Sequence, residues 1–172
     1  MTFSIRKIIR AFAAPEYRLS CSSRLWRDGF EELRRRTEGT HESGAFLLGD
    51  RDGERRRVTR FVYYDDLDPH ALATGIVIFD GAGYGPLWEL CRATGLSVVA
   101  DIHVHPGRAS QSKSDRENPM VAQLGHIALI VPNLAHRLVG PRELGIYEYQ
   151  GQHQWLHCNQ HAEKYFYIGF WG

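Results

Sequence analysis

Two histidines and one aspartate near the middle of the chain have the types and the spacing of a metal site. His103 and His105 are separated by one residue, and Asp115 follows ten residues after His105. Side chains of a strand alternate between its two faces, so both imidazoles would lie on one face and could reach one point. Three protein ligands that leave a fourth position for water are the arrangement of a catalytic zinc ion. The pattern therefore points to a zinc hydrolase.

The sequence around these three residues predicts the strand and the helix that must position them. An apolar run, broken only by Asp101, predicts a strand over Ser97–His105. Ser114-Asp115-Arg116-Glu117 matches a capping box with Ser114 as the N-cap, which would place Asp115 in the first turn of a helix. Asp101 shares the ligand face by alternation. It is either an acceptor for a ligand histidine or simply a hydrogen-bonded strand residue.

Further strands alternate with helices along the chain. Ser22 or Ser23 could cap a helix whose buried stripe is Leu25, Trp26, Phe30 and Leu33, and a second helix is expected around Leu87–Ala93. Strands are expected at Tyr17–Cys21, Ala45–Leu48, Val58–Tyr64, Thr74–Phe79, His126–Val131, Gly145–Tyr149 and Gln154–His157, with a hairpin turn at Asp52-Gly53. Strands interleaved with about three helices indicate one α/β domain with a mixed sheet.

Size and composition limit the function classes. The 172 residues fit a single domain, assigned to 17–172, and the net charge of +1 gives no global field for nucleic acid. No apolar run reaches the ~20 residues of a membrane span. The three cysteines are scattered, which suits a reducing cytoplasm.

Residues 1–16 form an extension in which apolar residues at helical spacing stand beside basic ones. An element that docks on the domain or on a partner is expected here, and the alternatives are a transit peptide, a membrane-surface helix or a strand.

Other metal-binding folds fail on particular residues. A helical H-E-x-x-H site is absent, and an amidohydrolase barrel needs about 250 residues. A cupin would have a glutamate shortly after His105, where the chain has Gly107-Arg108-Ala109-Ser110. A histidine-triad nucleotide hydrolase needs a third histidine where Asp101 stands.

The remaining pattern resembles the JAMM (MPN-plus, Prok-JAB) metalloprotease family. It consists of a glutamate ahead of an early strand, then H-x-H-P, then S-x-x-D. The chain shows Glu42-Ser43-Gly44-Ala45-Phe46-Leu47-Leu48-Gly49, His103-Val104-His105-Pro106 and Ser112-Lys113-Ser114-Asp115. The resemblance covers about residues 20–150. It implies a single MPN/JAB-like domain with a curved mixed sheet, of cytidine-deaminase-like architecture.

Carried over by position, the resemblance implies one catalytic zinc ion held by His103, His105 and Asp115. Glu42 would be the general base, and Ser112 would hydrogen-bond the developing oxyanion. The spacer between His105 and Ser112 is one residue shorter than in eukaryotic deubiquitinases of the family. Val104, between the two histidines, should face the opposite side of the sheet.

The resemblance also implies a substrate. Short segments such as Val98–Asp101 and Asn118–Met120 resemble the bacterial branch of the family. The genes of that branch often lie beside genes for ubiquitin-like conjugation, including antiphage operons. The expectation is a cytoplasmic deubiquitinase-like isopeptidase acting on a ubiquitin-like protein and its conjugates, with E1-like and E2-like proteins as further partners and no nucleic acid or membrane. The alternatives are a peptidase that processes a sulfur-carrier protein and a non-catalytic MPN scaffold.

The remaining histidines give a weaker metal signal. His153, His157 and His161 are spaced by four residues, which would form a metal face on a helix, but the sequence between them looks strand-like. His126 begins an apolar strand and is interpreted as a satisfied core or edge histidine.

Overall fold

A computed structural model describes residues 17–79, 81–170 and 172, so the expected N-terminal extension, residues 1–16, lies outside the described residues. Eight strands form one sheet in the spatial order β7-β6-β5-β4-β2-β3-β1-β8. Their bounds are β1 Leu19–Ser22, β2 Gly44–Asp52, β3 Arg55–Tyr63, β4 Ser97–Val104, β5 Ile127–Val131, β6 Gly145–Gly151, β7 Gln154–His157 and β8 Phe166–Gly169. β4 runs parallel to β5 and antiparallel to β2, so the predicted mixed sheet is confirmed.

The described residues contain five α-helices, where the sequence predicted about three. Their bounds are α2 Ser23–Arg36, α3 Tyr64–Leu67, α4 Gly81–Thr94, α5 Lys113–Glu117 and α6 Ala162–Tyr165. The two additional helices, α3 and α6, have four residues each. Four residues span about one turn, which is too short for a helical period to show in the sequence.

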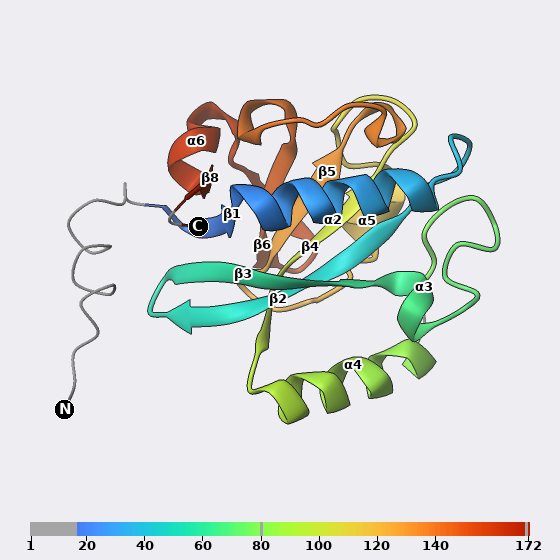
Figure 1. Cartoon of the computed structure of the whole chain (residues 1–172), viewed down its shortest axis with the longest axis horizontal. Helices are drawn as coiled ribbons and strands as arrows, with labels where there is room; N and C mark the ends of the chain where they lie inside the picture. The colour runs from blue at the N-terminus through green and yellow to red at the C-terminus, as the bar shows by residue number, and fades with distance from the viewer. Residues whose placement is uncertain (1–16, 80, 171) are drawn as a thin grey trace.

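The two long helices cover opposite faces of the sheet. In Figure 1, β2 and β3 lie between α2 and α4. Ala45 and Leu47 of β2 pack in the core cluster that contains the α2 residues Trp26, Phe30 and Leu33. Phe46 and Leu48 pack in a second cluster, which contains Leu87 of α4. Because β2 is covered on both faces, its first half reads as a continuous apolar run rather than an alternating one.

The β2–β3 hairpin forms where the sequence predicts it. Asp52 pairs with Arg55, which leaves Gly53 and Glu54 as the turn. Gly53 has a φ of +58°, a value that glycine adopts without steric cost. The turn lies one residue later than the predicted Asp52-Gly53 pair.

The predicted strand at Thr74–Phe79 is wrong. These residues form turns and irregular backbone. Val77 and Phe79 still point inward and pack on the α4 side of the core, which explains the alternation in the sequence. Their backbone meets the segment around Glu42, where Glu42 N–H donates to the Gly75 carbonyl over 3.0 Å.

The helix α4 begins earlier than predicted. It includes the glycine-rich stretch before the predicted start at Leu87, and it contains Pro86. Tyr84 and Leu87 anchor this first half in the core, and a Cβ on Gly83 would lie 2.4 Å from the ring of Phe79. Tertiary packing therefore overrides the low helix propensity of glycine and proline.

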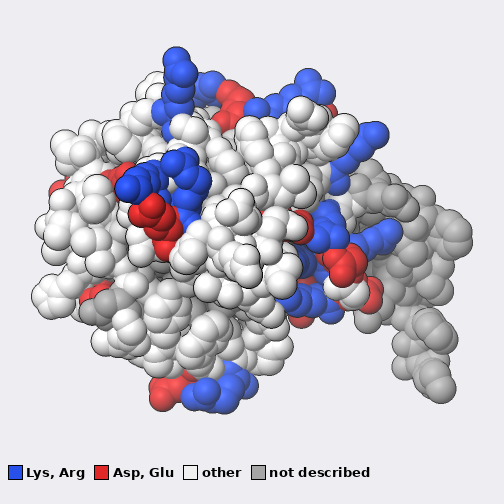
Figure 2. All heavy atoms as spheres, turned by 180° about the vertical axis from the view of Figure 1, so that it is seen from behind, with Lys and Arg blue, Asp and Glu red and all other residues white. Residues whose placement is uncertain are grey.

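On the face shown in Figure 2, uncharged residues fill the middle, and lysines and arginines stand beside acidic residues nearer the edges. Among the described residues, no helix is both long and apolar enough to cross a bilayer.

Candidate metal centre

The strand β4 separates the apolar core from the polar site. Ile102 and Val104 are fully buried in the core cluster on the α2 side. Asp101 and His103 alternate with them and face the other side, and Tyr64 of that side contacts Asp101. The prediction that Val104 faces away from the ligands is therefore confirmed.

His105 lies directly after β4 and is held by the backbone. Its N–H donates to the Val131 carbonyl over 2.8 Å, and its carbonyl accepts from Leu134 N–H over 2.9 Å. Leu134 belongs to the 3₁₀ turn Asn133–Ala135, in which all three residues have left-handed φ values of 50° to 54°. Non-glycine residues in this conformation cost about 1–2 kcal/mol each. This strained turn was not predicted, although Asn133 after Pro132 favours a turn.

Three of the predicted site residues converge. The His103 and His105 Nε2 atoms are 2.9 Å apart. Asp115 places Oδ1 3.6 Å from His103 Nε2 and Oδ2 3.3 Å from His105 Nε2. One ligand atom from each residue lies within 4.8 Å of the others. Two imidazoles and one carboxylate that share a single point are a donor set suited to a divalent transition metal.

The carboxylate of Asp115 is positioned by the N-terminus of α5, but not by the predicted cap. Ser112, not Ser114, is the N-cap: its Oγ accepts from Asp115 N–H over 3.1 Å. Asp115 Oδ2 in return accepts from Ser112 N–H over 2.6 Å. The capping box is thus Ser112–Asp115, and it fixes the carboxylate at the first turn of the helix.

Glu42 lies beside the three converging residues without joining them. Its Oε1 is 4.0 Å from His105 Nε2, and its Oε2 accepts from Val77 N–H over 3.2 Å. The side chain is 17% exposed, so solvent reaches it. The carboxylate is therefore fixed in orientation and still open to a water molecule.

Charge within the site favours protonated histidine and ionised carboxylates in the metal-free protein. Burial alone would lower the pKa of His103, but the carboxylates of Asp101 and Asp115 outweigh it and raise that pKa to about 10. Burial would raise the pKa of Asp115, but hydrogen bonds from His103 and His105 hold it far below its usual range. The site therefore attracts positive charge.

Two aromatic side chains from the β6–β7 hairpin hold the two ends of the α5 segment. Tyr147 OH accepts from Gln111 N–H over 3.3 Å, and Trp155 Nε1–H donates to the Arg116 carbonyl over 3.2 Å. These contacts bracket Ser112 and Asp115. Nothing in the local sequence signals them, because they join residues 36 and 39 positions apart.

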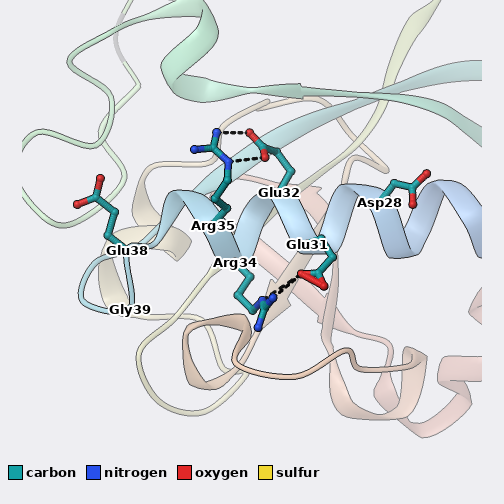
Figure 3. Close-up of a pocket in the computed structure, with 7 residues that line it drawn as sticks. All are labelled: Asp28, Glu31, Glu32, Arg34, Arg35, Glu38 and Gly39. Carbon is teal, nitrogen blue, oxygen red and sulfur yellow. Dashed lines mark hydrogen bonds and ion pairs between the residues drawn. The ribbon is translucent and has the colours of Figure 1, made fainter.

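Other candidate residues do not form a second centre. His157 is in β7 and stacks on Tyr147, His153 is in the preceding turn, and His161 is in a 3₁₀ turn, so the three do not share a helix face. The hollow on α2 in Figure 3 is lined by charged residues, but Arg34 pairs with Glu31 and Arg35 with Glu32. Within each of these two pairs the charges offset each other on the helix surface, and Asp28 pairs with Arg24.

Comparisons with known proteins bear on this centre. No family model matches the chain. Over 61 residues the chain is 33% identical to the "Probable metalloprotease y4jG" of Sinorhizobium fredii (strain NBRC 101917 / NGR234). This match covers 36% of the chain and 38% of that protein.

Solved structures resemble the fold. The solution structure of protein DSY2949 from Desulfitobacterium hafniense matches with a TM-score of 0.60 at 17% identity, over 87% of this chain and 92% of that one. A protein from Salinibacter ruber matches with a TM-score of 0.48 at 19% identity, over 76% of this chain and 84% of that one. The first likeness shows a shared fold. Together, the fold and the sequence match show that the chain is a mixed α/β domain that is similar, over part of its length, to a probable metalloprotease.

Proposed function

We propose that this protein is a JAMM-type zinc peptidase that hydrolyses the bond after the C-terminus of a ubiquitin-like protein. The observation that carries the proposal is the convergence of His103, His105 and Asp115 with Glu42 beside them. The similarity to a probable metalloprotease supports the reaction class. The peptide or isopeptide bond of a ubiquitin-like substrate rests on the sequence resemblance.

The spacing of the donor atoms fits zinc. Ligands about 2.0–2.1 Å from a tetrahedral ion lie about 3.3 Å from one another. The two Nε2 atoms are 2.9 Å apart, and the Asp115 carboxylate places Oδ2 3.3 Å from His105 Nε2 and its other oxygen, Oδ1, 3.6 Å from His103 Nε2. His103 and His105 would bind through Nε2, and Asp115 through its carboxylate. When bound, zinc lowers the pKa of a water molecule toward ~7 and so supplies a hydroxide-like nucleophile.

Glu42 has the geometry of a base that acts on that water. Its Oε2 is occupied by the Val77 N–H, which leaves Oε1, the oxygen nearer His105, free to accept a proton. The same oxygen can return this proton to the leaving amine. Proton transfer by a positioned carboxylate contributes about 10²–10⁴ to a rate.

Ser112 would stabilise the oxyanion with the hydrogen of its hydroxyl group. Its Oγ accepts from Asp115 N–H, so the O–H hydrogen remains free to donate. The residue is exposed at the edge of the centre. One well-placed oxyanion donor is worth about 10²–10³ in rate.

The proposed setting is a bacterial ubiquitin-like conjugation system in the cytoplasm, with antiphage defence as one such system. The substrate tail would bind as an extended strand beside the centre, a common way to read a peptide. E1-like and E2-like proteins would be further partners.

Metal analysis and a cleavage assay test the proposal together. The purified protein should contain one zinc ion, and His103→Ala should contain none. The wild type should cleave a ubiquitin-like fusion, lose activity with a chelator and regain it with zinc. Absence of stoichiometric zinc in the wild type would contradict the proposal.

The same assay separates the alternatives. The panel should contain ubiquitin-like fusions, isopeptide-linked conjugates and a sulfur-carrier precursor. If the protein cleaves the sulfur-carrier precursor in preference to the others, the proposed substrate class would be wrong and the proposed mechanism would stand. Zinc binding and tight substrate binding without any cleavage would favour the non-catalytic scaffold.

A further inference from the structure

A buried polar cluster stands behind the metal ligand His103. It consists of Asp101, His126 and Tyr64, which are 2%, 2% and 0% exposed. A buried carboxylate is costly unless it is hydrogen-bonded, and cores normally fill such space with apolar side chains. The cluster lies on the same face of β4 as His103, which suggests that its position serves the ligand.

Asp101 is the centre of the cluster. Its Oδ1 accepts from His126 Nε2–H over 2.6 Å, and its Oδ2 accepts from Tyr64 OH over 3.4 Å. The same Oδ2 is 4.0 Å from His103 Nδ1, which is longer than a hydrogen bond. His126 precedes β5, and β5 pairs with β4 at Asp101, so the sheet itself brings these side chains together.

Two buried histidine ring nitrogens of this region have no hydrogen-bond partner. His103 Nδ1 is buried and has no hydrogen-bond partner, and Asp101 is the carboxylate that faces it. A histidine that binds metal through Nε2 carries its hydrogen on Nδ1 and usually donates it to a carboxylate, carbonyl or water. His126 Nδ1 is also without a partner, which suits a ring that carries its hydrogen on Nε2 and donates it to Asp101.

We propose that Asp101 is a positioning residue that holds His103 with its Nε2 lone pair toward the metal, and that His126 and Tyr64 hold Asp101. With the metal bound, Asp101 would accept the Nδ1–H of His103, which would keep the ring from rotating or presenting the wrong nitrogen. His126, directly before β5, and Tyr64 of α3 hold one oxygen of Asp101 each. This inference rests on the proposed metal site and adds the residues that orient one of its ligands.

Zinc affinity measured by competition with a chromophoric chelator tests the proposal without any substrate. Asp101→Asn should bind zinc about 10–100-fold more weakly than the wild type, the usual loss when such a partner is removed. Its Co²⁺ derivative should show an altered visible absorption spectrum, because the orientation of the ligand changes. Val62→Ala, a core substitution on the same side of the sheet, should lower thermal stability and leave affinity and spectrum unchanged.

Two substitutions at His126 separate positioning from packing. His126→Gln can still donate to Asp101 and should retain zinc affinity within about threefold. His126→Leu cannot donate and should lose about tenfold or more. If Asp101→Asn fails to fold, the two His126 variants test the positioning role instead. Tyr64→Phe, which removes the hydroxyl group that contacts Asp101, should then show a smaller loss of zinc affinity than His126→Leu.

The outcomes distinguish this inference from the proposed function. Wild-type zinc affinity and an unaltered Co²⁺ spectrum in Asp101→Asn or His126→Leu would overturn the positioning role alone. Equal losses in His126→Gln and His126→Leu that follow thermal stability would do the same. A wild-type protein that binds no zinc would overturn both.

Discussion

The Nε2 atoms of His103 and His105 are close enough to require something positive between them. At 2.9 Å, two imidazole lone pairs repel unless a proton or a metal ion lies between the nitrogens. Asp115 adds negative charge at the same point. Glu42 lies 4.0 Å from His105 and is held by the Val77 N–H, so its position suits proton transfer rather than metal binding.

Replacing Glu42 separates these two roles. Glu42→Gln keeps the size of the side chain, so zinc content should remain stoichiometric, while turnover should fall at least ~100-fold. Zinc analysis and initial rates on the same preparations check this. Glu38→Gln, whose side chain is 79% exposed, serves as a control with unchanged activity. Retained activity in Glu42→Gln would remove Glu42 as the base.

At the scale of elements, short segments carry the proposed ligands and longer segments hold these short segments in place. The helix α5 has five residues and depends on its cap and on the β6–β7 hairpin for its position. The helix α2 packs on the other face of the sheet, and on its surface Glu32 pairs with Arg35 (Figure 3). Glu32 also pairs with Arg36. The two cases allow separate tests.

Removing one hydroxyl group should loosen α5. Tyr147→Phe deletes the 3.3 Å hydrogen bond from Gln111 N–H and keeps the ring stacked on His157. A typical hydrogen bond contributes about 0.5–1.5 kcal/mol, so zinc affinity should fall about 2–10-fold in a chelator competition. Tyr63→Phe removes an equally long bond, to the Gly29 carbonyl, away from the centre. An equal loss of affinity in both variants would contradict the role of Tyr147.

The ion pairs of α2 should make stability depend on pH in acid. Hydrogen bonds from Arg35, reinforced by Arg36, lower the pKa of Glu32 from 4.5 to about 2. Because the folded pKa is the lower one, this stabilisation is present above pH 4.5 and is lost as the pH falls toward 2. It should amount to about 0.5–1 kcal/mol, since the pair is at the surface.

Denaturant unfolding at several pH values checks this expectation. Glu32→Gln should be less stable than the wild type at neutral pH, and the difference should disappear near pH 2. Glu31→Gln, which removes a pair with one arginine on the same helix, is the matched control and should show a smaller effect. A difference independent of pH would exclude the ion pairs as its cause.

At the scale of the molecule, the proposed metal centre joins parts of the chain that are distant in sequence. Glu42 precedes β2, His103 lies in the last part of β4 and His105 directly after it, and Asp115 is in the first turn of α5. A ligand that binds only the folded state therefore stabilises the whole domain. The strained turn at Asn133–Ala135, which holds His105, adds a cost that the surrounding packing must offset.

Removal of metal should lower the unfolding temperature of the whole domain. At a free zinc concentration 100 times the dissociation constant, the gain in stability is about 2.7 kcal/mol. Calorimetry of the metal-free protein with and without added zinc measures it. His103→Ala should show no increase, and an equal increase in this variant would place the bound zinc elsewhere.

Local patterns in the sequence determined the parts of this protein that depend on neighbouring residues. Alternation predicted that the side chains of His103 and His105 lie on the same side of the sheet, where their Nε2 atoms meet, and Asp52-Gly53 predicted the β2–β3 hairpin within one residue. The stripe of Trp26, Phe30 and Leu33 predicted the buried face of α2. These features follow from the periods of strands and helices and from the φ preference of glycine.

Only the tertiary structure decided what lies across the chain from these residues. Thr74–Phe79 alternates like a strand but contacts the Glu42 segment, and Ser112 rather than Ser114 caps α5. The contacts of Asp101 with His126 and Tyr64, and of Tyr147 with Gln111, join residues 25 to 37 positions apart. Such contacts depend on the strand order of the sheet, which no local periodicity encodes.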